Sequence, residues 1–160
     1  MPVFNRYFLV PDPATPGTGT FGHDILFNGG PRLPVEIKVP NALASFLTQK
    51  GQQVPAPVSG EALVDTGASI SCVDETVVQG LGINPVGIAQ VGTPSTASTS
   101  QLQYPVLFQF PGTTLPSIEI AHALGSVLRP QGLLALIGRD ILSSFVFVYN
   151  GLGGFVTLAY

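Results

Sequence analysis

The chain has 160 residues, enough for one domain with a proper core and too few for two domains of ordinary size. Its net charge of −3 and six scattered basic residues exclude the basic patch that is typical of a nucleic-acid-binding protein. The single cysteine excludes an intramolecular disulfide and a cysteine metal cluster, and the two histidines are isolated, so we expect no metal and no cofactor.

The hydrophobic fraction of 45% is high, while only 9% of the residues are charged. No apolar run approaches the roughly 20 residues that a membrane helix needs, so we expect no membrane segment. A large self-association surface would bury the excess, although an apolar monomer with short loops would also fit. The first residues show no secretion signal, and a lone cysteine fits a reducing compartment such as the cytoplasm.

Many short runs of valine, isoleucine, leucine and phenylalanine, with 19 glycines and 15 prolines, predict a mainly β chain. We expect residues 1–31 to form an N-terminal extension, with a strand over 4–10 and a Pro/Gly/Thr loop over 11–20. Alternating apolar and polar residues predict a strand over 33–39, at the start of a single domain spanning 32–160.

Helix-capping residues mark the short helices. Asn41 can cap a helix that ends at Gly51, and Asp74 can cap one that ends at Gly82. A third short helix is expected over 139–144. Further strands are expected over 61–64, 70–73, 102–110, 115–120, 133–137, 145–149 and 155–160, the last two joined by a Gly-rich turn.

Asp65 has the most distinctive surroundings of the nine carboxylates. It directly follows an apolar strand and precedes small residues that let a backbone or a ligand approach closely. Thr66 offers a hydroxyl beside it, and Gly67 permits a tight turn. The pattern fits a catalytic carboxylate, and it fits equally an Asx-type turn after a strand, because Asp, Thr and Gly are all common turn residues.

A second segment, Leu134–Leu142, is an apolar strand interrupted by Gly138 and continued as a helix. Together with Ala62–Ser69, and in this order, it resembles the retropepsin-like aspartic proteases. There an apolar pair precedes Asp-Thr/Ser-Gly-Ala, and an Ile-Gly-Arg-Asn/Asp segment follows later. The resemblance covers roughly residues 33–160. It implies an all-β fold with one or two short helices: a single-lobe, closed, β-barrel-like acid protease domain that is dimeric.

The same resemblance implies roles for single residues. Asp65 would be the catalytic carboxylate, with Thr66 joining contacts that lock two active-site loops together across the dimer. Gly67 would present its carbonyl to the substrate backbone. The full implied set is Asp65, Thr66 and Gly67 for catalysis, Gly67, Ala68, Val91, Gly92, Leu136 and Ile137 for substrate binding, and Gly138, Arg139 and Asp140 for structural and interface contacts.

Two further features concern the surroundings of this site. Residues 91–101 fall where the family has its flap, a hairpin that closes over substrate, although a surface hairpin without function has the same composition. Ser69 stands where viral members usually carry an aspartate that pairs with the arginine. Either Arg139 therefore pairs with another acid, or the interface network differs.

The chemistry implied requires two carboxylates that share one proton. The chain has one Asp-Thr-Gly, so the second aspartate must come from another copy across a two-fold axis. Residues 4–10 and 155–160 are candidates for the interface, because pairing strand ends would remove exposed edges. We expect an endopeptidase that cleaves extended peptides with apolar side chains. The alternatives are a dimerisation or peptide-binding module of the same fold with little or no catalysis, and an unrelated β-rich binding domain.

Overall fold

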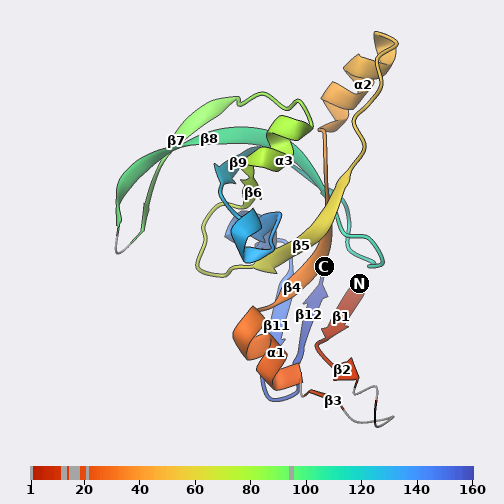
Figure 1. The fold of residues 1–160 in the computed structure, drawn as a ribbon, viewed down its shortest axis with the longest axis vertical. Coiled ribbons are helices and arrows are strands. Elements are labelled where there is room, and N and C mark those ends of the chain that lie inside the picture. Colours follow the sequence, from red (N-terminus) through yellow and green to blue (C-terminus); the bar gives the residue numbers. More distant parts are fainter. Residues whose placement is uncertain (1, 12–13, 15–18, 21, 94–95) are drawn as a thin grey trace.

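The computed structural model describes all residues except 1, 12–13, 15–18, 21 and 94–95, and it is built mainly of strands with a few short helices (Figure 1). The described strands form a seven-stranded sheet, a three-stranded sheet and a two-stranded ribbon. The prediction of a mainly β chain is confirmed. The predicted loop over 11–20 lies partly outside the described residues.

The strands of the large sheet are, in spatial order, β4 (Arg32–Lys38), β5 (Val58–Val64), β10 (Ala135–Ile137), β6 (Cys72–Asp74), β9 (Ile118–Ser126), β8 (Thr96–Gln109) and β7 (Gly87–Thr93). The three-stranded sheet has the order β1 (Val3–Tyr7), β12 (Phe155–Ala159), β11 (Val146–Asn150), and the ribbon pairs β2 (Val10–Pro11) with β3 (Gly19–Thr20). The helices are α1 (Gly22–Gly29), α2 (Asn41–Gln49), α3 (Glu75–Gly80), α4 (Arg139–Leu142) and the 3₁₀ helix η1 (Arg129–Gln131).

The main core lies between the strands of the large sheet. In β4, Leu33, Val35 and Ile37 are buried while their neighbours are half-buried, as the predicted alternation requires. β4 pairs with β5 and, in its second half, with β8. The strand order from β4 through β5, β10, β6, β9 and β8 therefore leads back to β4. Complete burial of one Leu, Ile, Val or Phe side chain contributes about 1.5–3 kcal/mol to the stability of the fold. The strands β5 and β10, which precede the two parts of the candidate site, are each hydrogen-bonded to a neighbouring strand on both sides.

The N-terminal segment is part of a second, smaller sheet. β1 pairs antiparallel with β12 along its whole length, and β12 pairs on its other side with β11. A small cluster of Phe8, Leu26 and Val156 covers this sheet and buries the inner face of α1, a helix that the sequence did not predict. Arg6 reaches across to Glu61 of β5 with two hydrogen bonds of 2.8 and 3.2 Å. The described part of residues 1–31 thus contributes β1, the β2–β3 ribbon and α1.

This pairing corrects one expectation. β12, inside the predicted interface segment 155–160, has neighbours on both sides within its own chain and offers no free edge. The open edges of the small sheet belong to β1 and β11 instead. The reason is the Gly-rich turn after β11, which folds β12 back onto it. There Gly154 approaches Gly22 so closely that a Cβ on Gly154 would lie 2.5 Å from Gly22 Cα.

The capping predictions have mixed outcomes. Asp74 caps α3 as predicted, with its side chain accepting from the backbone N–H of Thr76, and Gly82 follows with φ +69°. Asn41 does not cap α2, whose N-cap is Pro40. The amide of Asn41 instead donates a hydrogen bond of 2.6 Å to Glu119. None of the helices in the described part of the chain is long and apolar enough to cross a membrane.

Candidate active site

The loop after β5 holds the carboxylate of Asp65 in a tight turn. The backbone N–H of Asp65 donates to the carbonyl of Ile137 at 2.9 Å, and the N–H of Gly67 donates to Asp65 Oδ1 at 2.8 Å. Asp65 Oδ2 accepts no hydrogen bond from any described residue. The Asx-type turn is therefore present, and it orients the carboxylate with one oxygen free for a ligand.

Arg139 ties α4 to this loop. Its guanidinium donates to the carbonyls of Thr66 and Gly67 at 2.7 and 3.0 Å and to Ser69 Oγ at 2.7 Å. Its backbone N–H donates to the carbonyl of Ala68 at 2.9 Å. No carboxylate pairs with Arg139 among the described residues, so Ser69 and two backbone carbonyls take the place of the acid partner. The hydroxyl of Thr66 makes no hydrogen bond within the described chain.

A buried polar group lies beneath the loop. Ser71 is 0% exposed, and its hydroxyl accepts from Gly138 N at 2.9 Å while donating to Asp140 Oδ1 at 2.7 Å. The N–H of Ser71 donates to the other oxygen of Asp140 at 2.9 Å. A Cβ on Gly138 would lie 2.8 Å from the carbonyl carbon of Ile70, so only glycine fits against the loop here. Ser71 was not predicted from the sequence, because its burial depends on segments far apart in the chain.

A cavity of about 470 Å³ opens beside Asp65, between the loop and the β7–β8 hairpin. It brings together five positions predicted for catalysis or substrate binding, namely Asp65, Gly67, Ala68, Val91 and Gly92. The other residues lining it are Ser69, Ile70, Cys72, Gln90, Gln101, Leu124 and Ser126. The predicted flap, 91–101, forms part of this hairpin, although residues 94–95 lie outside the described structure.

Leu136 and Ile137, which were predicted to bind substrate, do not line this cavity. β10 is flanked by β5 and β6, and alternation along it turns Ile137 into the main core, where it is 1% exposed. Leu136 points to the opposite side and packs against the cluster that contains Cys72 and Leu124. Any contact of these two residues with a substrate stays a prediction.

Cys72 forms part of the cavity wall. Burial raises the pKa of Cys72, and the carboxylates of Asp140 and Asp65 raise it further, against a hydrogen bond with Ser126 that lowers it. A thiol with a raised pKa is a poor nucleophile, so Cys72 is a weaker candidate for the reactive group than Asp65.

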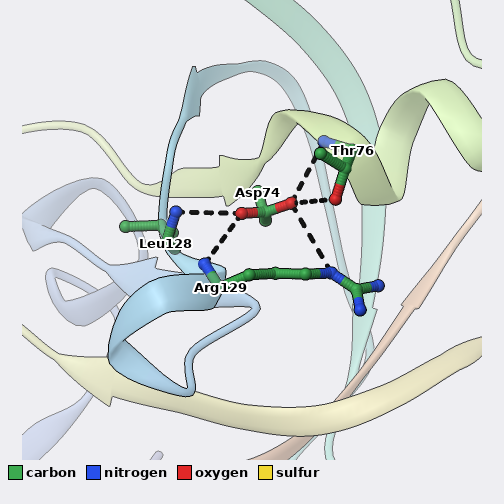
Figure 2. Close-up of polar contacts among 4 residues, drawn as sticks. All are labelled: Asp74, Thr76, Leu128 and Arg129. Carbon is green, nitrogen blue, oxygen red and sulfur yellow. Dashed lines mark hydrogen bonds and ion pairs between the residues drawn. The ribbon is translucent and has the colours of Figure 1, made fainter.

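Asp74 is a second buried carboxylate, and it has a structural role (Figure 2). Its oxygens accept from Thr76 N and Oγ1 and from the backbone N–H groups of Leu128 and Arg129, both at 2.9 Å. Burial by itself would raise the pKa of Asp74, but these hydrogen bonds outweigh it and the pKa is lowered. Asp74 thereby fastens the start of α3 to the segment after β9. The described residues include no group of three or more His, Cys, Asp or Glu side chains able to hold a metal ion.

Comparisons with known proteins give similarities in structure only. No protein-family model matches the chain, and no curated protein matches its sequence. Similar solved structures include a retropepsin-like aspartic protease from Rickettsia conorii, with a TM-score of 0.47 and 13% identity over 98% of this chain and 90% of that one. The simian foamy virus (mac) protease has a TM-score of 0.40 and 21% identity over 69% of this chain and 91% of its own.

A third similar structure is the foamy viral protease–reverse transcriptase in complex with an RNA/DNA hybrid. It has a TM-score of 0.44 and 20% identity, and the match covers 71% of this chain and 12% of that one. The chain thus corresponds to about an eighth of that viral protein. The similar structures are those of viral and retropepsin-like proteases, the class that the sequence motifs resemble.

Proposed function

We propose that the chain is one half of a homodimeric aspartic endopeptidase of the retropepsin-like type, with Asp65 as the catalytic carboxylate. The observation that carries this proposal is the position of Asp65, held by Gly67 at the end of a buried strand and open to a cavity beneath a β-hairpin. Arg139, Ser71 and Gly138 support the loop from behind, so the carboxylate is positioned by rigid elements rather than by a free loop.

In the proposed reaction, Asp65 and its counterpart in a second copy share one proton. The ionised carboxylate takes a proton from a water molecule, whose oxygen attacks the peptide carbonyl, and the protonated carboxyl gives its proton to the carbonyl oxygen. The second carboxyl, now ionised, then takes a proton from one hydroxyl of the resulting diol while the first gives its proton to the nitrogen, and the C–N bond breaks to release the amine and the carboxylic acid. The N–H of Gly67 holds Oδ1, which leaves Oδ2 to face the water.

A second copy is required because the chain contains a single Asp-Thr-Gly. The small sheet supports a place for it. One face of that sheet carries Val3, Tyr7, Val146 and Val148, all exposed, with Tyr7 at 68%. The positions on this face are uncharged, and β1 and β11 leave open edges beside it. Contact there would bury apolar surface that a monomer leaves in water.

The domain limits belong to the same proposal. Residues 32–160 would form the protease domain, in which the pairing of β4 with both β5 and β8 suits a closed, barrel-like single lobe. Residues 1–31 would be an extension that adds β1 and α1 to it. The substrate would be an extended peptide lying in the cavity under the β7–β8 hairpin.

The test is digestion of a peptide library across pH, with and without an inhibitor that mimics the transition state of aspartic proteases. Asp65→Asn should abolish cleavage and keep the same sedimentation coefficient, while Asp24→Asn, at an exposed position of α1, should cleave as the unmodified chain does. Cleavage that survives Asp65→Asn would refute the proposal. A chain that binds peptides and sediments as a dimer without cleaving any would be a peptide-binding module instead.

A further inference from the structure

The inner face of the β7–β8 hairpin carries a glutamine beside apolar side chains. Ala89 and Val91 pack against the cluster that contains Cys72 and Leu124. Gln101 of β8 lies directly opposite Ala89 in the antiparallel register, and opposite residues share a face of the sheet. Gln101 therefore faces the same way as these apolar residues, and it lines the cavity beside Asp65.

The side-chain carbonyl of Gln101 is buried without a partner. Among the residues that the structure describes, Oε1 of Gln101 is the one fully buried side-chain oxygen or nitrogen that makes no hydrogen bond. By contrast, the amide of Gln90 donates to Ser100 Oγ at 2.7 Å and accepts from Ser98 Oγ at 3.2 Å. Burying an unpaired amide oxygen costs about 1–3 kcal/mol, so a hydrogen bond from a bound molecule would stabilise it.

The lining of the same cavity also includes hydrogen-bond donors. Ser69 Oγ accepts from Arg139, so the hydrogen of its own hydroxyl is free for a ligand. Ser126 adds a second hydroxyl to the lining. The cavity wall next to Asp65 is thus partly polar, whereas a substrate with apolar side chains, as predicted from the sequence, would suit an apolar wall. A group that both donates and accepts hydrogen bonds would use this wall best.

We propose that Gln101 is a specificity-determining residue, whose buried side-chain carbonyl turns into the cavity and accepts a hydrogen bond from the carboxamide of an Asn or Gln in the substrate, next to the cleaved bond. The inference rests on the proposed function only in taking a peptide as the ligand. A carboxamide pairs with the Gln101 amide in either of its orientations. A carboxylate has no hydrogen to donate and would share the cavity with Asp65. An ammonium group accepts nothing from Ser69.

The first test measures binding and does not need catalysis. Short extended peptides that are identical except for Gln, Leu, Glu or Lys at one central position are titrated into the Asp65→Asn protein by calorimetry, with each central position scanned in turn. At one position the Gln peptide should bind about ten times more tightly than the Leu peptide. Gln101→Leu should remove this ratio, and Gln101→Glu should shift the preference to Lys. Equal binding of Gln and Leu peptides at every position would overturn the inference.

The second test measures cleavage with Asp65 intact. The kcat/KM ratio for the Gln and Leu peptides should fall from about ten to about one in Gln101→Leu. Gln103→Leu is the matched control, because Gln103 lies two residues further along the same strand, outside the cavity lining, and its ratio should not change. Equal losses on both peptides in Gln101→Leu would mean a structural role. A Gln preference in binding without any cleavage would refute the proposed catalysis and leave the role of Gln101 standing.

Discussion

Gly138→Ala tests whether the strand behind the active-site loop has room for a side chain. The added Cβ would lie 2.8 Å from Ile70 C and 2.9 Å from Ser71 N, and these backbone atoms cannot rotate away. The φ of Gly138 is −87°, which alanine adopts freely, so the effect is steric. Overpacking of this kind costs about 1–3 kcal/mol. Weakening the hydrogen bond from Gly138 N to Ser71 Oγ adds about 1 kcal/mol.

We therefore expect Gly138→Ala to lower the free energy of unfolding by about 2–3 kcal/mol, after allowing for the smaller entropy of the unfolded alanine chain. The assay is urea unfolding at one fixed protein concentration, read as a shift in midpoint with an unchanged slope. Gly80→Ala is the control, because no atom lies within 4 Å of its added Cβ in α3, and it should stabilise by about 0.5–1 kcal/mol. If Gly138→Ala unfolds within about 0.5 kcal/mol of the unmodified chain, the steric reasoning is wrong.

Three further predictions concern polar contacts. Ser71→Ala should lower the free energy of unfolding by about 1–3 kcal/mol, because it leaves the buried N–H of Gly138 without an acceptor; a urea midpoint that does not move would contradict this. The pKa of Asp74 is below its ordinary 3.8 in the fold, so its stabilisation is present above that pH and lost as the pH falls through the lower folded value. Asp74→Asn should be less stable than the unmodified chain at neutral pH, and the two unfolding free energies should converge in acid; parallel curves in urea series down to about pH 3 would count against it. For Glu61→Gln, combined with Arg6→Gln in a double-mutant cycle, the coupling should be at most about 1 kcal/mol, because the ion pair is partly exposed; a coupling above about 2 kcal/mol would show that exposure does not weaken it.

Local signals in the sequence predicted most of the strands, because alternation and turn residues act over short distances. Asp74 was correctly identified as a cap because its side chain bonds two residues away. α1 was missed because its stability comes from Leu26, which packs against Phe8 and Val156, and both lie outside the helix. A hairpin was predicted in this region, but the bounds of β7 were not, because its small and polar residues have weak strand propensity and its order comes from pairing with β8.

The residues of the candidate site were likewise predicted only in part. The motif around Asp65 and the segment around Gly138 could be identified from the sequence, and the structure brings them into contact through Arg139. Ser71 and Gln101 could not be identified, because what distinguishes them is burial, which depends on strands far apart in the chain. The position of β10 between two strands likewise decides that Ile137 belongs to the core.

The single cysteine gives the molecule a built-in chemical reporter. Cys72 is 9% exposed, and its thiol lies in the wall of the cavity that Asp65 and the β7–β8 hairpin share. A small alkylating reagent would reach it through that cavity, and the chain has no other thiol to compete. Its alkylation rate under native conditions therefore reports how far the cavity is covered. A bound peptide should slow labelling in proportion to occupancy, so mass spectrometry of the unlabelled protein can detect ligands without an activity assay.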